Sequence, residues 1–466
     1  MSPDRRELTR ESLLVGAASL LVAAIVAWLN WDHDVQGTVY RNHYLGLARF
    51  MHGEADVEIF TYPLWGFPAV LALTHYADFW IVAFQCLLAS LALALLYRNA
   101  ARHARSRRLL LVLCVFALPW YSLASAKIAD IWSVGFGLLA LLSLAQMFEK
   151  KSTAYAVLAG VLLGVACNFR SDYLAFAFGL PLGVAVLAPG YLKPHAKHFA
   201  LIIVIVPLCL VPWGLYRVAH GAPFGITSTN SGMVMVNSLG FDGNRWGISQ
   251  HDSERRAEVR EALGPDVLPW SVEGNAFLQA RFREAVAERP FEFVRNVGAN
   301  LTTMLKYGFY SVEVEPYLQP DDAIQFEVLK EQIKVMAGAR ANPFDIEEFR
   351  EQGLWDEDYS LSDVSGRLWA IASVRIAGSV LSGIFLMFVL IALARLVFFD
   401  RARLREPLLL SFSLGVIYTW ALVGLLNIDQ RQSNVLYVLG IPLVVDLFDR
   451  FVGRVRRRPA ESQNTA

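Results

Sequence analysis

Two aspartates on either side of a histidine are the first residues in the chain whose types and spacing could do chemistry. Asp32 and Asp34 stand in the stretch "WDHD", directly after a long apolar run. A carboxylate can accept the proton of an attacking hydroxyl group, and two neighbouring carboxylates can instead hold a divalent cation such as Mg²⁺ or Mn²⁺. The same loop contains Asp56 and Glu58, which could form a second acidic pair. Polar residues also end apolar segments without any function. These acids therefore indicate a functional site only if other charged groups lie beside them.

Basic residues that could complement these acids occur in three later turns. Arg170 and Asp172 lie in "NFRSDYL", Arg431 lies in "NIDQRQSNVLY", and Lys127 lies in "SAKIAD". Charged groups close to hydrocarbon are costly and mark either function or mutual pairing. A guanidinium group binds two phosphate oxygens at once and stabilises charge on a leaving phosphate. The pattern therefore predicts a phosphate-binding cleft if these turns share one face with the acids; in the alternative interpretation each arginine snorkels or pairs with a nearby aspartate.

The composition indicates what kind of element must position these residues. The 466 residues are 55% hydrophobic and 18% charged, with a mean hydropathy of +0.40. This is more apolar than a soluble protein of such length, and the apolar residues form blocks long enough to cross a bilayer. Lysine and arginine balance aspartate and glutamate at 42 each, which argues against nucleic acid as the main partner. The chain is therefore predicted to be mainly α: a polytopic transmembrane helical protein.

Apolar blocks predict about ten spans, and the four cysteines all lie inside such blocks. The segment 62–77 is also apolar, but it is short and contains Pro63 and Pro68, so we expect it to lie in the membrane interface. The first block is expected to be a retained helix and not a cleaved signal peptide. The cysteines lack metal-ligand spacing and are expected to be small buried side chains. The predicted spans are residues 12–29, 79–97, 109–123, 131–148, 153–167, 173–189, 199–218, 368–398, 407–426 and 432–449.

Basic clusters give these spans an orientation. Ten spans without 62–77 bring every cluster to one side, which is the cytoplasmic side by the positive-inside rule. Both termini are then cytoplasmic, and the first loop, 30–78, is extracytoplasmic together with an insertion at 219–367. Short outer turns are expected near 121–130, 168–172 and 427–431. The clusters are Arg5 to Arg10, "RNAARHARSRR" at 98–108, "EKK" at 149–151, Lys193 and Lys197, "DRARLRE" at 400–406 and "RVRRR" at 454–458.

The predicted organisation has four parts. An N-terminal membrane module of about seven spans covers 1–218 and includes the first outer loop; an extracytoplasmic domain covers 219–367. A C-terminal membrane module of about three spans covers 368–450, and a basic cytoplasmic tail covers 451–466. Within the insertion, "HDSERRAEVREALG" predicts a surface helix, and Pro290 divides two further helical patterns. The second of these, 291–309, is amphipathic and could lie on the membrane.

These pieces resemble the GT-C class of integral-membrane glycosyltransferases, which use polyprenyl-phosphate-linked sugars. That class carries an acidic motif in the first outer loop, which here is "DHD", and the loop continues to a Tyr-Pro-rich segment, here "TYPLWGFPAVLAL". The stretch "LAGVLLGVACNFRSDYLAFAFGLPL" looks like its paired spans with a polar, arginine-containing turn. The final "NIDQRQSNVLYVLGIPLV" resembles its last Arg-Tyr element, although Arg431 is displaced from Tyr437.

The resemblance implies an inverting transfer of sugar on the extracytoplasmic face of a bacterial inner membrane. The donor would be a polyprenyl-phosphate-linked sugar and the acceptor a hydroxyl or amine of a lipid, glycan or protein. Asp34 is the expected catalytic base and Asp32 the next candidate, while Arg170 and Arg431, with Lys127, would bind the donor phosphate. A transporter or flippase and a non-catalytic scaffold of the same fold remain alternatives, although we find no internal repeat of the transporter kind.

Overall fold

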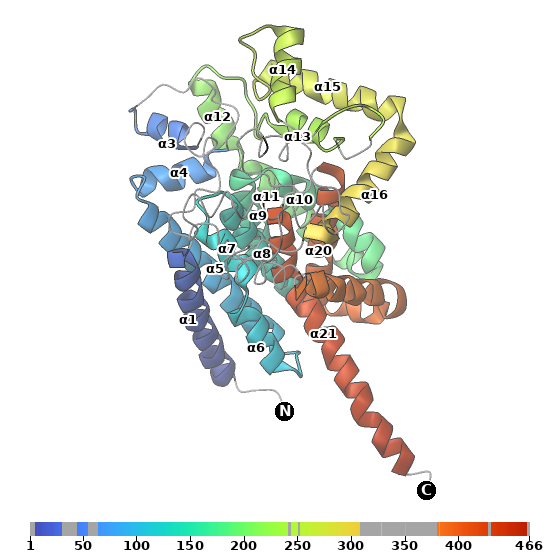
Figure 1. Cartoon of the computed structure of the whole chain (residues 1–466). Helices are drawn as coiled ribbons and strands as arrows, with labels where there is room; N and C mark the ends of the chain where they lie inside the picture. Colours follow the sequence, from blue (N-terminus) through green and yellow to red (C-terminus); the bar gives the residue numbers. More distant parts are fainter. Residues whose placement is uncertain are drawn as a thin grey trace.

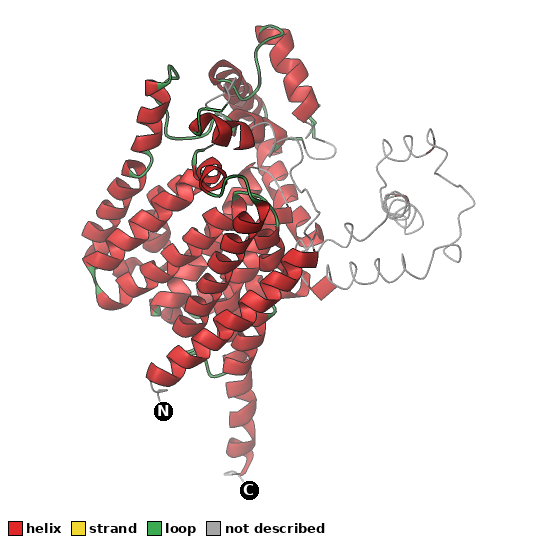
Figure 2. Ribbon diagram, turned by 90° about the vertical axis from the view of Figure 1, so that its left-hand side faces the viewer, coloured by secondary structure: helices red, strands yellow, loops and turns green. Residues whose placement is uncertain are grey.

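The computed structural model describes residues 5–29, 44–54, 64–240, 244–249, 252–307, 328, 350, 380–381, 383–426 and 430–463. Every regular element in these residues is a helix (Figure 2). Six of the described helices are long and apolar enough to cross a membrane, and three shorter apolar helices accompany them. The chain is therefore a mainly α-helical membrane protein, as its composition predicted. The six are Arg6–Trp28, Asp78–Ala100, Arg107–Ser125, Asp130–Lys150, Pro189–Ala219 and Pro407–Leu425.

The apolar helices form one bundle with two distinct ends. Helix α1 packs along α5, and α9 packs between α8 and α11, while α20 packs against both α8 and α21 (Figure 1). We call the end where α8 and α10 begin the Arg170 end, and the opposite end, where α20 begins, the Arg403 end. The first residues of α1 and the last residues of α21 lie at the Arg403 end. The bounds are α1 Arg5–Leu29, α5 Asp78–Ala100, α8 Asp130–Lys150, α9 Thr153–Phe169, α10 Asp172–Leu187, α11 Ala196–Leu208, α20 Pro407–Leu426 and α21 Gln430–Gln463.

Two of the predicted spans are interrupted at prolines. The predicted span 109–123 is built from α6 (Arg107–Val115) and α7 (Leu118–Ser125), with Pro119 in the first turn of α7. Proline lacks an N–H and cannot continue the hydrogen-bond ladder of a preceding helix, so the chain breaks there. The turn expected near 121–130 is consequently shorter, since α7 continues to Ser125 and Tyr121 is fully buried within it. In the same way α11 is followed by a separate α12 (Val211–Ala219) with proline in its first turn.

The part of the first loop that the structure describes contains two short helices. The helices are α3 (Leu45–Met51) and α4 (Gly66–Leu73), and α4 falls within the apolar segment 62–77. At about 1.5 Å per residue, the eight residues of α4 measure roughly 12 Å, far less than a bilayer core of about 30 Å. This length agrees with the prediction that 62–77 does not cross.

Helices α13 to α16 form a small domain beyond the Arg170 end (Figure 1). Its core includes Val236, Leu239, Val259 and Leu278, all fully buried. The surface helix predicted from "HDSERRAEVREALG" is α14, and Pro290 begins α16 as expected. The bounds are α13 Ser231–Asn237, α14 Asp252–Leu263, α15 Val272–Glu288 and α16 Pro290–Tyr307.

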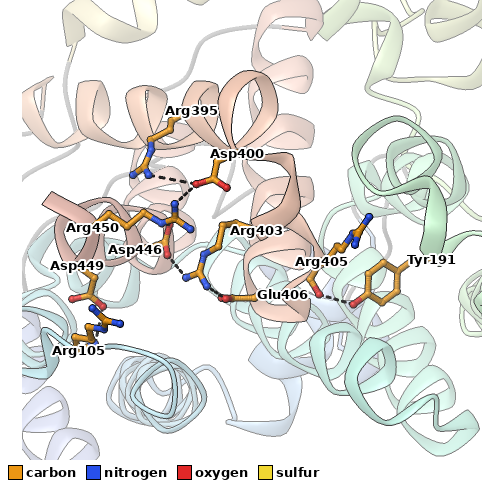
Figure 3. A network of polar contacts seen from close by, with 10 residues as sticks. All are labelled: Arg105, Tyr191, Arg395, Asp400, Arg403, Arg405, Glu406, Asp446, Asp449 and Arg450. Atoms are coloured by element: carbon orange, nitrogen blue, oxygen red, sulfur yellow. Dashed lines mark hydrogen bonds and ion pairs between the residues drawn. The ribbon is translucent and has the colours of Figure 1, made fainter. Parts of the chain in front are cut away.

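An ionic network joins helices at the Arg403 end (Figure 3). Arg403 pairs with Glu406 and with Asp446, which lies on α21. Asp449, one turn further along α21, accepts hydrogen bonds from the backbone N–H groups of Arg105 and Ser106, at 2.7 Å each. The contacts of Asp449 tie the last described helix to the turn between α5 and α6.

Candidate functional site

The residues singled out from the sequence fall into two groups. Arg170, Asp172 and Lys127 are described with their side chains, and Arg431 is the second residue of α21, described by its backbone alone. The remaining predicted site residues, Asp32, Asp34, Asp56 and Glu58, lie outside the described residues. Arg170 and Asp172 share one turn, which is the centre of the candidate site in the described residues.

The chain reverses direction at this turn within two residues. Helix α9 ends at Phe169, and Arg170 follows with an extended backbone (φ −146°, ψ 119°). Ser171 then leads into α10, whose first residue is Asp172. Asp130 is likewise the first residue of α8. Acidic side chains stabilise the first turn of a helix, where the positive end of the helix dipole lies, and both aspartates occupy this position.

Arg170 joins the two aspartates. Its Nη1 donates to Oδ1 of Asp130, while Nη2 and Nε both lie 2.9 Å from Oδ2 of Asp172. The side chain of Asp130 is only 8% exposed, against 22% for Asp172 and 29% for Arg170. Burial alone would lower the pKa of the Arg170 guanidinium, but the carboxylates of Asp172 and Asp130 outweigh it and raise this pKa above its ordinary value. Arg170 is thus a fixed cation with a partly open side.

The formal charge of the Arg170 cluster is unfavourable for binding a phosphate group. One guanidinium between two carboxylates has a formal charge of −1. Lys127, the neighbouring basic residue, places its Nζ 2.6 Å from Oδ2 of Asp78, which makes a neutral pair. Both basic groups therefore show the aspartate pairing that the sequence left open as an alternative. A phosphate group bound here would need a further cation, or one of these carboxylates would have to exchange its partner.

Aromatic side chains border the ionic cluster. Trp132 stacks on Phe169 with ring centroids 5.6 Å apart and planes 9° from parallel. Tyr418 on α20 donates its hydroxyl to the backbone carbonyl of Asp172 and lies 6.4 Å from the ring of Tyr173. These contacts hold the first turn of α10 against α20, which fixes the backbone that presents Asp172.

The described end of the first loop docks on the Arg170 turn. Trp65 Nε1 donates to Oδ1 of Asn168, which is two residues before Arg170 and 4% exposed. Gly66 follows, and a Cβ atom at this residue would lie 2.6 Å from the backbone oxygen of Asn168. Only glycine therefore permits this approach of α4 to α9 without a shift of the backbone. The contact places the described end of the first loop beside the arginine turn.

A second polar group lies where α4 ends. His75 and Tyr76 both adopt left-handed backbone conformations, with φ of 50° and 62°, which cost L-residues roughly 1 to 2 kcal/mol each. The ring of His75 lies 5.6 Å from that of His52, and the Tyr76 hydroxyl donates to Glu54 at 3.3 Å. Burial and the Glu54 carboxylate raise the pKa of the Tyr76 phenol. This turn leads directly into α5, and it is the last part of the first loop.

Several of these contacts were not predicted from the sequence. Tyr418 is a polar residue inside an apolar run, which is a usable signal, while Asn168 begins an expected turn and Asp130 stands directly before a predicted span. Trp65 carries no such signal, because a tryptophan near a span end is ordinary at a membrane interface.

Two other features of the described chain bear on this location: its possible metal ligands and a cavity at the opposite end of the bundle. No group of three His, Cys, Asp or Glu residues there has the geometry to hold a metal ion, and the aspartates predicted as metal ligands lie outside it. A cavity of about 110 Å³ lies at the Arg403 end, lined by Arg102, Glu149 and Arg403 among others. Ligand pockets usually measure roughly 300 to 1,000 Å³. Four cysteines were predicted to be buried: Cys86, Cys114 and Cys167 are buried, whereas Cys209 is only half-buried.

The comparisons with known proteins found no match. No protein-family model, curated protein or solved structure matches the chain. The candidate site is therefore defined by its own residues and their geometry.

Proposed function

We propose that the chain is an integral-membrane glycosyltransferase of the GT-C kind, which moves a sugar from a polyprenyl-phosphate-linked donor to a hydroxyl or amine of a lipid, glycan or protein acceptor. The observation that carries the proposal is the docking of Trp65 and Gly66 on the turn of Arg170. It joins the loop with the predicted catalytic acids to the arginine predicted to face the donor phosphate. Sugar transfer from a lipid phosphate requires both carboxylates and cationic side chains at the level of the lipid headgroups.

The proposed topology has ten spans with both termini in the cytoplasm. Pairings at the Arg170 end join the start of α5 to the turn before α8, and the start of α10 to both α8 and α20. Pairings at the Arg403 end join Tyr191 to Arg405 and Asp449 to the turn after α5. These contacts support an alternation of direction from helix to helix, with α6–α7 and α11–α12 each counted once. The Arg403 end carries the basic clusters, so it is assigned to the cytoplasm of a bacterial inner membrane.

In the proposed reaction Asp34 acts as the general base. Its carboxylate takes the proton of the acceptor hydroxyl as the acceptor oxygen attacks the anomeric carbon. The bond from that carbon to the phosphate oxygen breaks, and the electron pair leaves with the polyprenyl phosphate. Because the acceptor attacks from the face opposite the phosphate, the anomeric centre is inverted. Arg170 and Arg431, with Lys127, are proposed to stabilise the leaving phosphate. Asp32 supports Asp34, and Asp56 and Glu58 are the second acidic pair of the same loop.

The test is transfer by the full chain in phospholipid nanodiscs. A panel of polyprenyl-phosphate-linked sugars is offered with membrane-extracted lipid and glycan acceptors, and product is followed by mass spectrometry. The variant Asp34→Asn should retain the melting temperature of the native chain and lose transfer. Asp266→Asn, an exposed aspartate of the small domain, should retain both. Chelation followed by Mg²⁺ or Mn²⁺ addition determines the metal requirement in the same assay.

Each alternative function gives a different result. A transporter or flippase would move a lipid-linked substrate across sealed vesicles without chemical change, and a scaffold would do neither. Full transfer by Asp34→Asn would overturn the role of Asp34, while transfer lost in Asp32→Asn alone would move the base to Asp32.

A further inference from the structure

Helix α16 turns its polar side inward. Glu292, Asn296 and Asn300 follow one another at intervals of four residues, and their exposures are 8%, 0% and 3%. A surface helix of a soluble domain normally buries its apolar stripe and exposes the polar one. In α16 this polar stripe is buried together with the half-buried Phe293 and Val297, and other apolar residues are left on the outer side.

The buried polar stripe fixes the rotation of the helix. Asn296 Nδ2 donates to the backbone oxygen of Ser238 at 2.7 Å, and Asn300 Nδ2 donates to that of Gly424 at 3.2 Å. Ser238 in turn donates its hydroxyl to the backbone oxygen of Leu425 at 3.2 Å. The end of α13, the last turns of α20 and the middle of α16 are thus joined in one buried contact. The helix cannot turn its polar stripe to solvent without breaking the bonds that Asn296 and Asn300 donate.

The outward side of α16 is apolar with one arginine. Phe291 is 89% exposed and Val294 is 68% exposed, three residues apart and therefore on one face. The side chain of Arg295 is 51% exposed beside them, and its Nη1 lies 3.5 Å from Oε2 of the buried Glu292. Two large apolar side chains this exposed are unfavourable in water. Apolar residues with an adjacent basic residue are typical of helices that lie in a membrane interface.

The outward face of α16 lies close to the end of a candidate membrane span, which indicates what it contacts. Asn300 contacts α20 at Gly424, one residue before the end of the candidate span Pro407–Leu425. Leu425 is itself 45% exposed, so the lipid-facing surface of α20 reaches this level. Phe291 lies nine residues before Asn300, about 14 Å along the helix axis. Figure 1 shows α16 slanting from the small domain toward α20, so the helix rises less above the end of α20 than its length along the axis.

We infer that the face formed by Phe291, Val294 and Arg295 lies in the lipid headgroup layer at the Arg170 end, with the phospholipid bilayer as its partner. The apolar side chains enter the boundary of the acyl chains, and Arg295 meets phosphate oxygens of the headgroups. Helix α16 thereby anchors the domain of α13 to α15 to the membrane surface over the bundle. This inference does not depend on glycosyl transfer, because it follows from the exposed face and the contacts with α20.

Photocrosslinking tests the inference with little disturbance of the fold. Benzoylphenylalanine replaces Phe291, an exposed aromatic position, in the full chain in nanodiscs of phosphatidylethanolamine and phosphatidylglycerol. Irradiation should give a phospholipid adduct at residue 291, identified by mass spectrometry. The same amino acid at Glu261, an exposed residue of α14, should give none. A protein crosslink at 291 in place of a lipid adduct, or no more lipid adduct than at 261, would overturn the inference.

Spin labels give a second, independent reading. A nitroxide on a cysteine at position 294 should collide more with oxygen, which concentrates in lipid, than with a water-soluble nickel complex. The label at position 261 should show the reverse preference. A label at 294 that behaves like the label at 261, or that is shielded from both reagents, would count against lipid contact.

Discussion

Arg170 at the end of α9 donates a hydrogen bond to Asp130 at the start of α8, 40 residues earlier in the chain. Asp172, at the start of α10, holds the other side of the same guanidinium. One arginine therefore connects three helices at the end of the bundle where the first loop docks. Asp130 is the most buried of the three side chains.

Removal of the arginine should destabilise the bundle. Arg170→Gln leaves the Asp130 carboxylate buried without its cation, which costs roughly 3 to 5 kcal/mol in a fully buried pair. We expect about 2 kcal/mol here, because the Arg170 side chain is 29% exposed and solvent screens part of the interaction. Thermal unfolding in nanodiscs measures the change, and Arg260→Gln on the exposed side of α14 is the control.

The double variant shows whether the effect comes from the pair itself. Arg170→Gln combined with Asp130→Asn should be less destabilised than the sum of the two single variants, because the buried Asp130 carboxylate is no longer left without its cation. Strict additivity of the two changes would contradict a direct interaction between these side chains.

Two glycines provide a matched test of the docked loop. In Gly66→Ala the new methyl group would lie 2.6 Å from the backbone oxygen of Asn168, which cannot move aside as a flexible side chain would. We expect α4 to shift, the bond between Trp65 and Asn168 to break, and the local stability of 65–73 to fall by about 1 to 3 kcal/mol. Hydrogen exchange of this segment measures the loss.

Gly179 is the control for that substitution. It lies inside α10, and a Cβ there would meet no atom within 4 Å. Gly179→Ala should leave exchange in α4 unchanged and stabilise α10 by about 0.4 to 1 kcal/mol, because alanine restricts the unfolded chain. Equal effects of both substitutions would show that the tight contact at Gly66 has no energetic weight.

Most helix boundaries could be predicted from the sequence, because apolar blocks end at charged residues. The span expected at 131–148 is α8 from Asp130 to Lys150, and α20 has the predicted bounds 407–426. Breaks within an apolar block were not predicted. Pro119 allows a helix to start as well as to stop, and hydropathy alone does not distinguish the two.

In the site, too, contacts between residues close in sequence could be predicted, and contacts between distant residues could not. Arg170 and Asp172 are two residues apart, so their pairing was open to prediction. The bond from Arg170 to Asp130 depends on how α8 packs beside α9, and the bond from Trp65 to Asn168 joins residues 103 apart. Such contacts depend on helix packing and rotation, which a single sequence does not specify.

Asp449 should hold the turn between α5 and α6 at the other end of the bundle. Asp449→Ala removes a carboxylate that accepts from the N–H groups of Arg105 and Ser106, at 2.7 Å each. We expect faster exchange of both amides, by about tenfold, since a charge-assisted hydrogen bond contributes roughly 1.5 kcal/mol or more. Asp266→Ala, on the exposed surface of the small domain, is the control. Unchanged exchange at Arg105 and Ser106 would show that the turn is held by other contacts.

The assignment of sides can be tested with two single cysteines. Arg102 lies in the exposed turn after α5 at the Arg403 end, and Ser253 lies on α14 beyond the Arg170 end. If α4 does not cross the membrane, Ser253→Cys should react with an impermeant thiol reagent in intact cells, and Arg102→Cys should react only after permeabilisation. The native chain is the control, since three of its cysteines are buried and Cys209 is half-buried. Labelling of Arg102→Cys from outside would reverse the orientation and place the Arg170 cluster in the cytoplasm, where a lipid-linked donor on the outer leaflet could not reach it.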